Sequence, residues 1–216
     1  MVRTAVLVSG GGINLQSLID ANVFGEIPNF ELAAVISTNP EAYALKRAEM
    51  AGINTYVIDR EMFPSQTVFC FAVLDKLRDL DIELVVLAGY DCELGQPVFK
   101  YYEGKVIDTY PALLPSFTEP EDGDVQKEVL KAGVKLTGAT AFFVDEKKRF
   151  GPIIMQKAVA VREGDTPAGL QRRVLEEGEN FVLPRAVALY CQNRLNVENG
   201  VVHISNLASN DEKSSK

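Results

Sequence analysis

One stretch decides the fold of this 216-residue chain: Val106-Ile107-Asp108-Thr109-Tyr110-Pro111-Ala112-Leu113-Leu114-Pro115-Ser116-Phe117. Its apolar start predicts a short strand over residues 105–108, which leads into a loop marked by Pro111 and Pro115. Proline fixes φ and restricts the residue before it, so this loop has a defined shape. A loop that leaves a buried strand places its side chains at the strand's carboxyl end, where open α/β sheets hold their ligands. The Leu114-Pro115 bond is a candidate for the cis form.

Apolar runs alternate with helical patterns on both sides of this stretch. We expect strands at 4–9, 32–37, 55–58 and 83–88, and helices at 14–20, 40–51, 65–80 and 97–102. This alternation implies right-handed βαβ units and a mainly parallel sheet. After Pro115 the pattern predicts a helix at 122–132, long strands at 135–144 and 153–161 joined by a charged connection at 145–151, and one long helix at 166–193. Pro40 is expected in the first turn of its helix, and Asn199-Gly200 suits a type I′ hairpin turn.

The charge and the cysteines exclude several classes of function. Lys and Arg total 22 against 30 Asp and Glu, so the net charge is −8. Clustered Lys and Arg bind nucleic acid and anionic membranes, so we expect neither as a partner. No apolar run approaches the ~18 residues of a membrane span, and the first residues do not read as a signal peptide, so we expect a cytoplasmic protein. Cys70, Cys92 and Cys191 form no Cys-x-x-Cys motif, which predicts no metal site.

Four segments together resemble the glycinamide ribonucleotide (phosphoribosylglycinamide) formyltransferases, a family of purine biosynthesis. They are the stretch above, 9–16, 86–90, and 137–140 with 151–156, in family order and spacing. The resemblance implies an α/β, Rossmann-like formyltransferase fold whose mainly parallel twisted sheet has about seven strands and helices on both faces. It also implies one formyltransferase-like domain over 1–205, with a nucleotide-binding half at about 1–100 and a folate and catalytic half at about 101–205. Residues 206–216 are expected to form a flexible tail.

The resemblance also assigns binding residues, and here the chain departs from the family. Backbone N–H groups between a strand and a helix can face an anion, and the phosphate-binding positions are Gly11, Gly12, Ile13 and Asn14. The family usually has Ser at position 13, and its phosphate-binding Arg is replaced by Gln66. Glu179 matches a ribose contact, whose companion Gln is replaced by Glu176. The segment whose backbone would receive the folate ring is Tyr90, Asp91, Cys92, Glu93 and Leu94.

The three catalytic positions of the family are all substituted. Where the family has Asn, His and Asp, this chain has Asp108, Tyr110 and Arg149. An ionised Asp only accepts hydrogen bonds and repels the oxyanion that formyl transfer creates. Tyr has an ordinary pKa near ~10 and Arg stays protonated, so neither is a base at pH 7. Asp108 and Arg149 are expected to form an ion pair across the old site.

Two hypotheses follow from this conflict. The first is a catalytically impaired paralogue, in a binding or regulatory role, that keeps a nucleotide-like pocket with its phosphate-binding loop. The second is an active formyltransferase, or another folate-dependent acyl transferase, with a rearranged site. The partner in either case is a small molecule, 10-formyltetrahydrofolate is the co-substrate if the protein is active, and the protein is expected to be a monomer or homodimer.

Overall fold

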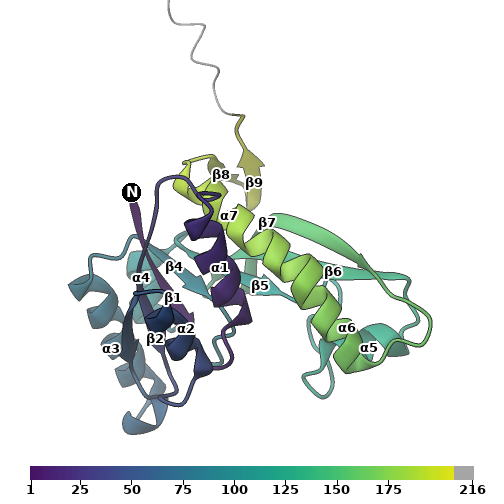
Figure 1. Cartoon of the computed structure of the whole chain (residues 1–216), viewed down its shortest axis with the longest axis horizontal. Helices are drawn as coiled ribbons and strands as arrows, with labels where there is room; N and C mark the ends of the chain where they lie inside the picture. The colour runs from purple at the N-terminus through teal and green to yellow at the C-terminus, as the bar shows by residue number, and fades with distance from the viewer. Residues whose placement is uncertain (207–216) are drawn as a thin grey trace, which may run out of the picture.

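The chain folds around a seven-stranded sheet with helices on both faces, and the computed structural model describes residues 1–206 (Figure 1). The strand order is β3-β2-β1-β4-β5-β6-β7. The first five strands in this order are parallel to one another, β6 is antiparallel to β5, and β7 is antiparallel to β6. This confirms the predicted fold class. The strands are β1 (Val2–Val8), β2 (Phe30–Ser37), β3 (Asn54–Val57), β4 (Leu84–Leu87), β5 (Val106–Tyr110), β6 (Leu136–Asp145) and β7 (Arg149–Ala160).

The two faces of the sheet carry different helices because side chains alternate along each strand. Val6 and Val8 of β1 point to a core shared with α1, α2 and α7, while Ala5 and Leu7 point to a core shared with α3 and α4. The helical segments are α1 (Ile13–Val23), α2 (Tyr43–Met50), η1 (Arg60–Met62), α3 (Gln66–Asp79), α4 (Gln96–Tyr102), α5 (Val125–Lys131), α6 (Pro167–Arg173), η2 (Val174–Glu179) and α7 (Asn180–Cys191).

Local sequence signals explain several element ends. The Ser65 hydroxyl accepts the Val68 N–H and starts α3, and the Thr166 hydroxyl caps α6 in the same way. Asn199 and Gly200 both have positive φ, as a type I′ turn requires, and join β8 (Leu195–Glu198) to β9 (Val201–Ile204) in a separate two-stranded sheet. The hairpin confirms its prediction, and both helices begin within one residue of the predicted starts at 65 and 166. The Leu114-Pro115 bond is cis.

Two predicted helices differ from the structure. The helix expected at 40–51 begins only at Tyr43, because the Asn39 carboxamide oxygen accepts the Glu41 N–H at 2.8 Å and holds residues 39–42, including Pro40, in a turn. The single helix expected at 166–193 is divided by the π-helical stretch η2. In η2, Gly178 packs directly on β6; a Cβ there would lie 2.9 Å from that of Ala139.

The charged connection expected at 145–151 is also shorter in the structure. Strand β7 begins at Arg149, which pairs with Asp145, so only residues 146–148 form the turn. The Asp145 carboxylate accepts the N–H groups of Lys147 and Lys148 at 2.8 and 2.9 Å, and these bonds allow the tight reversal. The predicted tail falls almost wholly outside the described residues, and the division into two halves stays a prediction. Within residues 1–206, no helix has the length and apolar character needed to cross a membrane.

Candidate functional site

Most of the predicted site residues come from segments at the carboxyl edge of the sheet: they follow β1, follow β4 or lie in β5, and Glu179 at the end of η2 joins them. Arg149 begins β7, where its pairing with Asp145 places its backbone toward the amino end of β5. Chain connections run in opposite directions from β1 and β4, which are neighbours in the sheet. Ligands of open α/β sheets bind in the crevice beyond the strand ends at such a switch point.

The glycine loop, residues 10–12, is a tight turn between β1 and α1. Gly12 has φ 72°, and a Cβ there would lie 2.7 Å from the Cβ of Ala44, so position 12 requires glycine. A Cβ on Gly10 or Gly11 would meet nothing. Arg47 of α2 donates from Nε to the Gly11 carbonyl at 2.9 Å and thereby holds the loop. No local sequence pattern points to Arg47, because only the packing of α2 brings it to the loop.

Three side chains from distant segments form a polar cluster beside this loop. Glu179 Oε2 accepts from Asn14 Nδ2 at 2.7 Å and from the Thr109 hydroxyl at 2.9 Å. Burial raises the pKa of Glu179, and the two hydrogen bonds oppose that shift. Asn14 is 8% exposed, and its Oδ1 has no partner among the described residues. The structure thus brings Asn14, a predicted phosphate-binding residue, together with Glu179, the predicted ribose-binding residue. It adds Thr109, which was not predicted although its hydroxyl stands in a largely apolar strand.

Asp108 lies in the middle of β5 and does not form the predicted ion pair with Arg149. Its Oδ1 accepts the Thr109 N–H at 2.7 Å. Arg149 turns its guanidinium over the Phe150 ring, 5.1 Å from the ring centre, and no Asp108–Arg149 ion pair occurs within residues 1–206. Burial, with the charge of Glu179, raises the pKa of Asp108 to about 7, although the Thr109 hydrogen bond and Arg149 lower it. A large share of Asp108 is therefore protonated at neutral pH, where the sequence suggested a plain carboxylate.

Tyr110 is held in an aromatic stack, which we define as Tyr110, Phe142 and Phe150. The rings of Tyr110 and Phe150 meet edge to face at 4.8 Å, and those of Phe142 and Phe150 at 5.3 Å. The Tyr110 hydroxyl donates to the Phe117 carbonyl at 2.5 Å, and Phe117 has the uncommon φ of 59°. Burial also raises the pKa of Tyr110, which makes it a still poorer base. The stack therefore uses both the ring and the hydroxyl of Tyr110.

The Tyr110→Phe change tests whether this hydroxyl supports the loop. We expect the free energy of unfolding to fall by about 1 kcal/mol, because the Phe117 carbonyl loses its partner while the ring stack stays. Denaturant unfolding of both proteins measures the difference. An unchanged free energy of unfolding would show that water replaces the hydroxyl and that the loop does not depend on Tyr110.

The predicted folate segment, 90–94, is tied to the sheet by its own polar groups. Asp91 accepts from the Ser9 and Thr38 hydroxyls at 2.5 and 3.2 Å, and its N–H donates to the Ser9 oxygen at 3.0 Å. These bonds lower the pKa of Asp91 despite the opposing effect of burial. The Glu93 carbonyl accepts from Gln66 at 2.5 Å. Side chains of the protein therefore already use two of the segment's backbone groups.

Gln66 and Glu176, the other two substituted binding positions, both make local contacts. Gln66 Oε1 accepts from Arg60 Nε at 2.9 Å, so this side chain links η1 to the segment after β4. Glu176 pairs with Arg172 at 2.8 Å, and 55% of its side chain is exposed. It therefore does not join Glu179 in the polar cluster.

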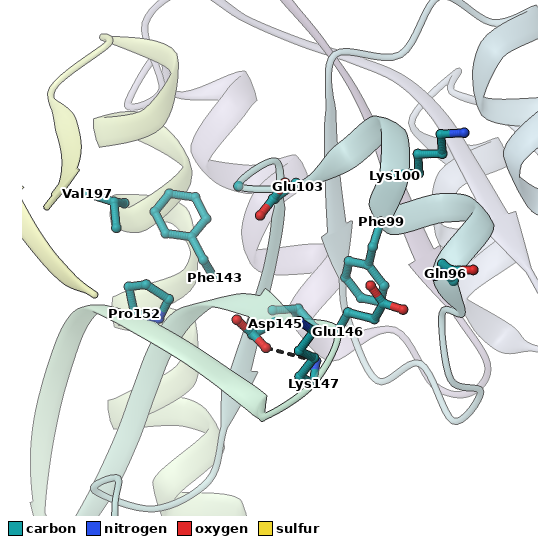
Figure 2. A pocket seen from close by; sticks show the side chains of 12 residues that line it. Gln96, Phe99, Lys100, Glu103, Phe143, Asp145, Glu146, Lys147, Pro152 and Val197 are labelled. Carbon is teal, nitrogen blue, oxygen red and sulfur yellow. Dashed lines mark hydrogen bonds between the residues drawn. The ribbon is translucent and has the colours of Figure 1, made fainter. Parts of the chain in front are cut away.

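A cavity of about 800 Å³ lies between α4 and the turn that joins β6 to β7 (Figure 2). Phe99 of α4 and Phe143 of β6 form part of its wall, and Lys100, Glu103 and Lys147 add charge. Neither the 90–94 segment nor the three substituted catalytic positions line it. The described part of the chain places no cluster of three His, Cys, Asp or Glu side chains where they could hold a metal.

Comparisons with known proteins agree with this architecture. The sequence profile of the formyl transferase family matches residues 2–187. A phosphoribosylglycinamide formyltransferase of Haemophilus influenzae is 32% identical over 208 residues, which cover 96% of each chain. The chain belongs to this family. The crystal structure of glycinamide ribonucleotide transformylase 1 from Symbiobacterium toebii superposes with a TM-score of 0.90 at 38% identity, over 95% of each chain.

Longer proteins contain the same family domain. The trifunctional purine biosynthetic protein adenosine-3 of Gallus gallus is 40% identical over 197 residues, or 91% of this chain. The chain spans only 19% of that relative. Family membership settles the fold, while the side chains present at the site bear on what this chain does.

Proposed function

We propose that this protein is a catalytically impaired relative of the glycinamide ribonucleotide formyltransferases that still binds a phosphorylated small molecule at its glycine loop. The observation that carries the proposal is the contrast between two parts of one site. The loop and the polar cluster of Asn14, Thr109 and Glu179 are well formed, whereas Tyr110 belongs to the aromatic stack. An assay of formyl transfer by the unmodified protein tests the impaired half of the proposal, and anion binding tests the retained half.

Catalytic impairment is supported by the chemistry of the substituted positions. Formyl transfer from 10-formyltetrahydrofolate to an amine needs donors for the tetrahedral oxyanion and a group that accepts a proton. The Tyr110 hydroxyl already donates to the Phe117 carbonyl, and the raised pKa of Tyr110 keeps this hydroxyl protonated at neutral pH, so it cannot act as a base. Arg149 cannot accept a proton, and it stacks on Phe150. Two of the three positions are therefore engaged in packing.

Retained anion binding is supported by the loop itself. Gly11 and Gly12 precede α1 directly, so the first amides of the helix and its positive end face the same side. Asn14 is the second residue of α1, so its backbone N–H is one of the first amides of the helix, which have no intrahelical acceptor. Arg47 adds a positive charge next to the loop. None of these groups depends on the side-chain hydroxyl of the Ser that the family usually has at position 13, where this chain has Ile13.

An active enzyme with a rearranged site is the alternative, and one observation favours it. Asp108 has a pKa of about 7, so part of the population at neutral pH carries a carboxylic acid O–H. A protonated carboxyl can donate to an oxyanion, which a carboxylate cannot. The turnover of the unmodified protein distinguishes this alternative from impairment.

Paired glycine variants test the retained loop. We expect Gly12→Ala to abolish measurable sulfate binding, because Ala would adopt a left-handed φ and press on Ala44. Gly10→Ala should bind sulfate like the unmodified protein, since its added Cβ meets open space. Titration calorimetry with sulfate measures both variants, and circular dichroism checks that each is folded. Equal binding by both variants, or no binding by the unmodified protein, would contradict a loop-based anion site.

A further inference from the structure

Two half-buried acids lie near one another beside the glycine loop, Asp108 in β5 and Glu179 at the end of η2, and we call them the acid pair. Glu179 is bonded to the first turn of α1, next to the glycine loop, through the 2.7 Å hydrogen bond from Asn14. Asp108 joins the same network through its neighbour Thr109, whose N–H it accepts and whose hydroxyl binds Glu179. The carboxyl groups lie close enough for the Glu179 charge to disfavour ionisation of Asp108.

The charges around the acid pair leave it only partly compensated. From β7, Arg149 favours ionisation of Asp108, but its guanidinium is stacked on Phe150 rather than paired with the carboxylate. From α1 and β5, Glu179 receives neutral donors, Asn14 and Thr109. From α2, the Arg47 guanidinium is bonded to the Gly11 carbonyl and the Gln16 side chain. The carboxyl groups therefore remain sensitive to any further negative charge at the loop.

We propose that binding of a dianion at the glycine loop is coupled to uptake of one proton by the acid pair. The inference rests on the proposed anion binding. A dianion next to Asn14 repels the carboxylate form of both acids, so the protonated form becomes more stable. The proton comes from the solvent and adds to a carboxylate oxygen, with no other bond made or broken. By linkage, the dianion binds more tightly at low pH, where the acid pair is already protonated.

The pH dependence has a definite sign. Burial raises the pKa of both acids in the free protein, to about 7 for Asp108, and a bound dianion raises it further. Affinity for the dianion should therefore be highest below pH 7 and should fall as the pH rises through and above 7. Each unit by which the ligand raises the pKa corresponds to about a tenfold loss of affinity across this range.

Sulfate is the suitable probe because it stays a dianion throughout this range, so any proton taken up belongs to the protein. Titration calorimetry at pH 7 in imidazole, bis-Tris and Tris avoids sulfonate buffers that could compete for the loop. We expect the observed enthalpy to depend on the ionisation enthalpy of the buffer, with a slope that reports net proton uptake. We also expect sulfate affinity to fall by about tenfold or more between pH 6 and pH 8.5.

Variants of the acid pair assign the proton. Asp108→Asn and Glu179→Gln should each bind sulfate with reduced proton uptake, and the double variant should bind with none. Glu177→Gln is the matched control, because Glu177 belongs to the same stretch but faces Arg162 at 3.9 Å and is 54% exposed. Its proton uptake should equal that of the unmodified protein. Circular dichroism establishes that each variant is folded, and Asp108→Asn alone suffices if Glu179→Gln does not fold.

The outcomes separate this inference from the proposed function. Sulfate binding with an enthalpy independent of the buffer and a flat affinity from pH 6 to pH 8.5 overturns proton coupling and leaves anion binding intact. Full proton uptake by the folded double variant, or by Asp108→Asn and Glu179→Gln alike, overturns the assignment to the acid pair. No saturable sulfate binding at pH 6 removes the proposed anion site, and the coupling with it.

Discussion

Supplied with 10-formyltetrahydrofolate and glycinamide ribonucleotide, the unmodified protein should transfer formyl groups with a kcat below about 0.1 s⁻¹. A typical enzyme turns over at about 10 s⁻¹, and the loss of one oxyanion donor lowers the rate by about 10²–10³-fold. Tyr110 and Arg149 are engaged in the aromatic packing around Phe150, so they cannot compensate. A spectrophotometric assay of folate product measures this rate. Turnover at about 1 s⁻¹ or more would refute impairment and favour a working role for protonated Asp108.

Restoration variants show whether the three positions limit the rate together. Groups that act as a unit are strongly non-additive, so Asp108→Asn, Tyr110→His and Arg149→Asp should each stay near background when made alone. The triple variant is the one that can gain activity. Phe150 would still pack on Phe142 there, so the same triple variant with Phe150→Gly is a useful companion. A single restoration that reaches the triple variant's rate would show that only one position matters.

The largest loss of stability from a single isosteric change should come at Thr140 of β6. Its hydroxyl is fully buried, donates to the Ala112 carbonyl at 2.8 Å and accepts from the Leu114 N–H and the Gln156 amide at 3.0 Å each. Thr140→Val leaves these groups without that partner, and each unpaired buried group costs about 1–3 kcal/mol. We expect a loss of about 3 kcal/mol, which lowers the melting temperature by about 6–12 °C. Thermal unfolding followed by circular dichroism measures it.

Thr137, three residues earlier on the same strand, provides the matched control. Its hydroxyl is also buried, at 1% exposure, but has no partner among the described residues. Thr137→Val should therefore leave the melting temperature unchanged or raise it slightly. Equal destabilisation by the two changes would mean that the methyl packing, and not the hydrogen bonds, determines the effect at Thr140.

The sequence was most informative where a local rule controls the backbone. The alternation of apolar strands and helices predicted the sheet and the helix starts near 65 and 166, and Asn199-Gly200 marked the hairpin. Each of these signals acts within a few residues. The start of the helix predicted at Pro40 was wrong for a similar reason, because the Asn39 side chain stabilises a local turn there instead.

The candidate site was harder because its properties arise between distant segments. The ion pair of Asp108 and Arg149 was predicted only because both residues occupy catalytic positions of the family. In the structure, the Arg149 guanidinium lies over the Phe150 ring instead. The raised pKa of Asp108 depends on burial by the completed fold, which no local pattern encodes. Thr109 was overlooked because its hydroxyl becomes meaningful only once Glu179 packs on β5.

The hydrogen bond between Asn14 and Glu179 has a consequence for the order in which the molecule matures. It joins residues 165 positions apart, and Thr109 joins the same acid across 70 positions. Contacts this distant form late, because the loop entropy of the intervening chain must be lost first. During synthesis, β1, the glycine loop and α1 emerge long before η2, which carries Glu179. A nascent chain therefore cannot form the cluster of Asn14, Thr109 and Glu179 until residue 179 has left the ribosome.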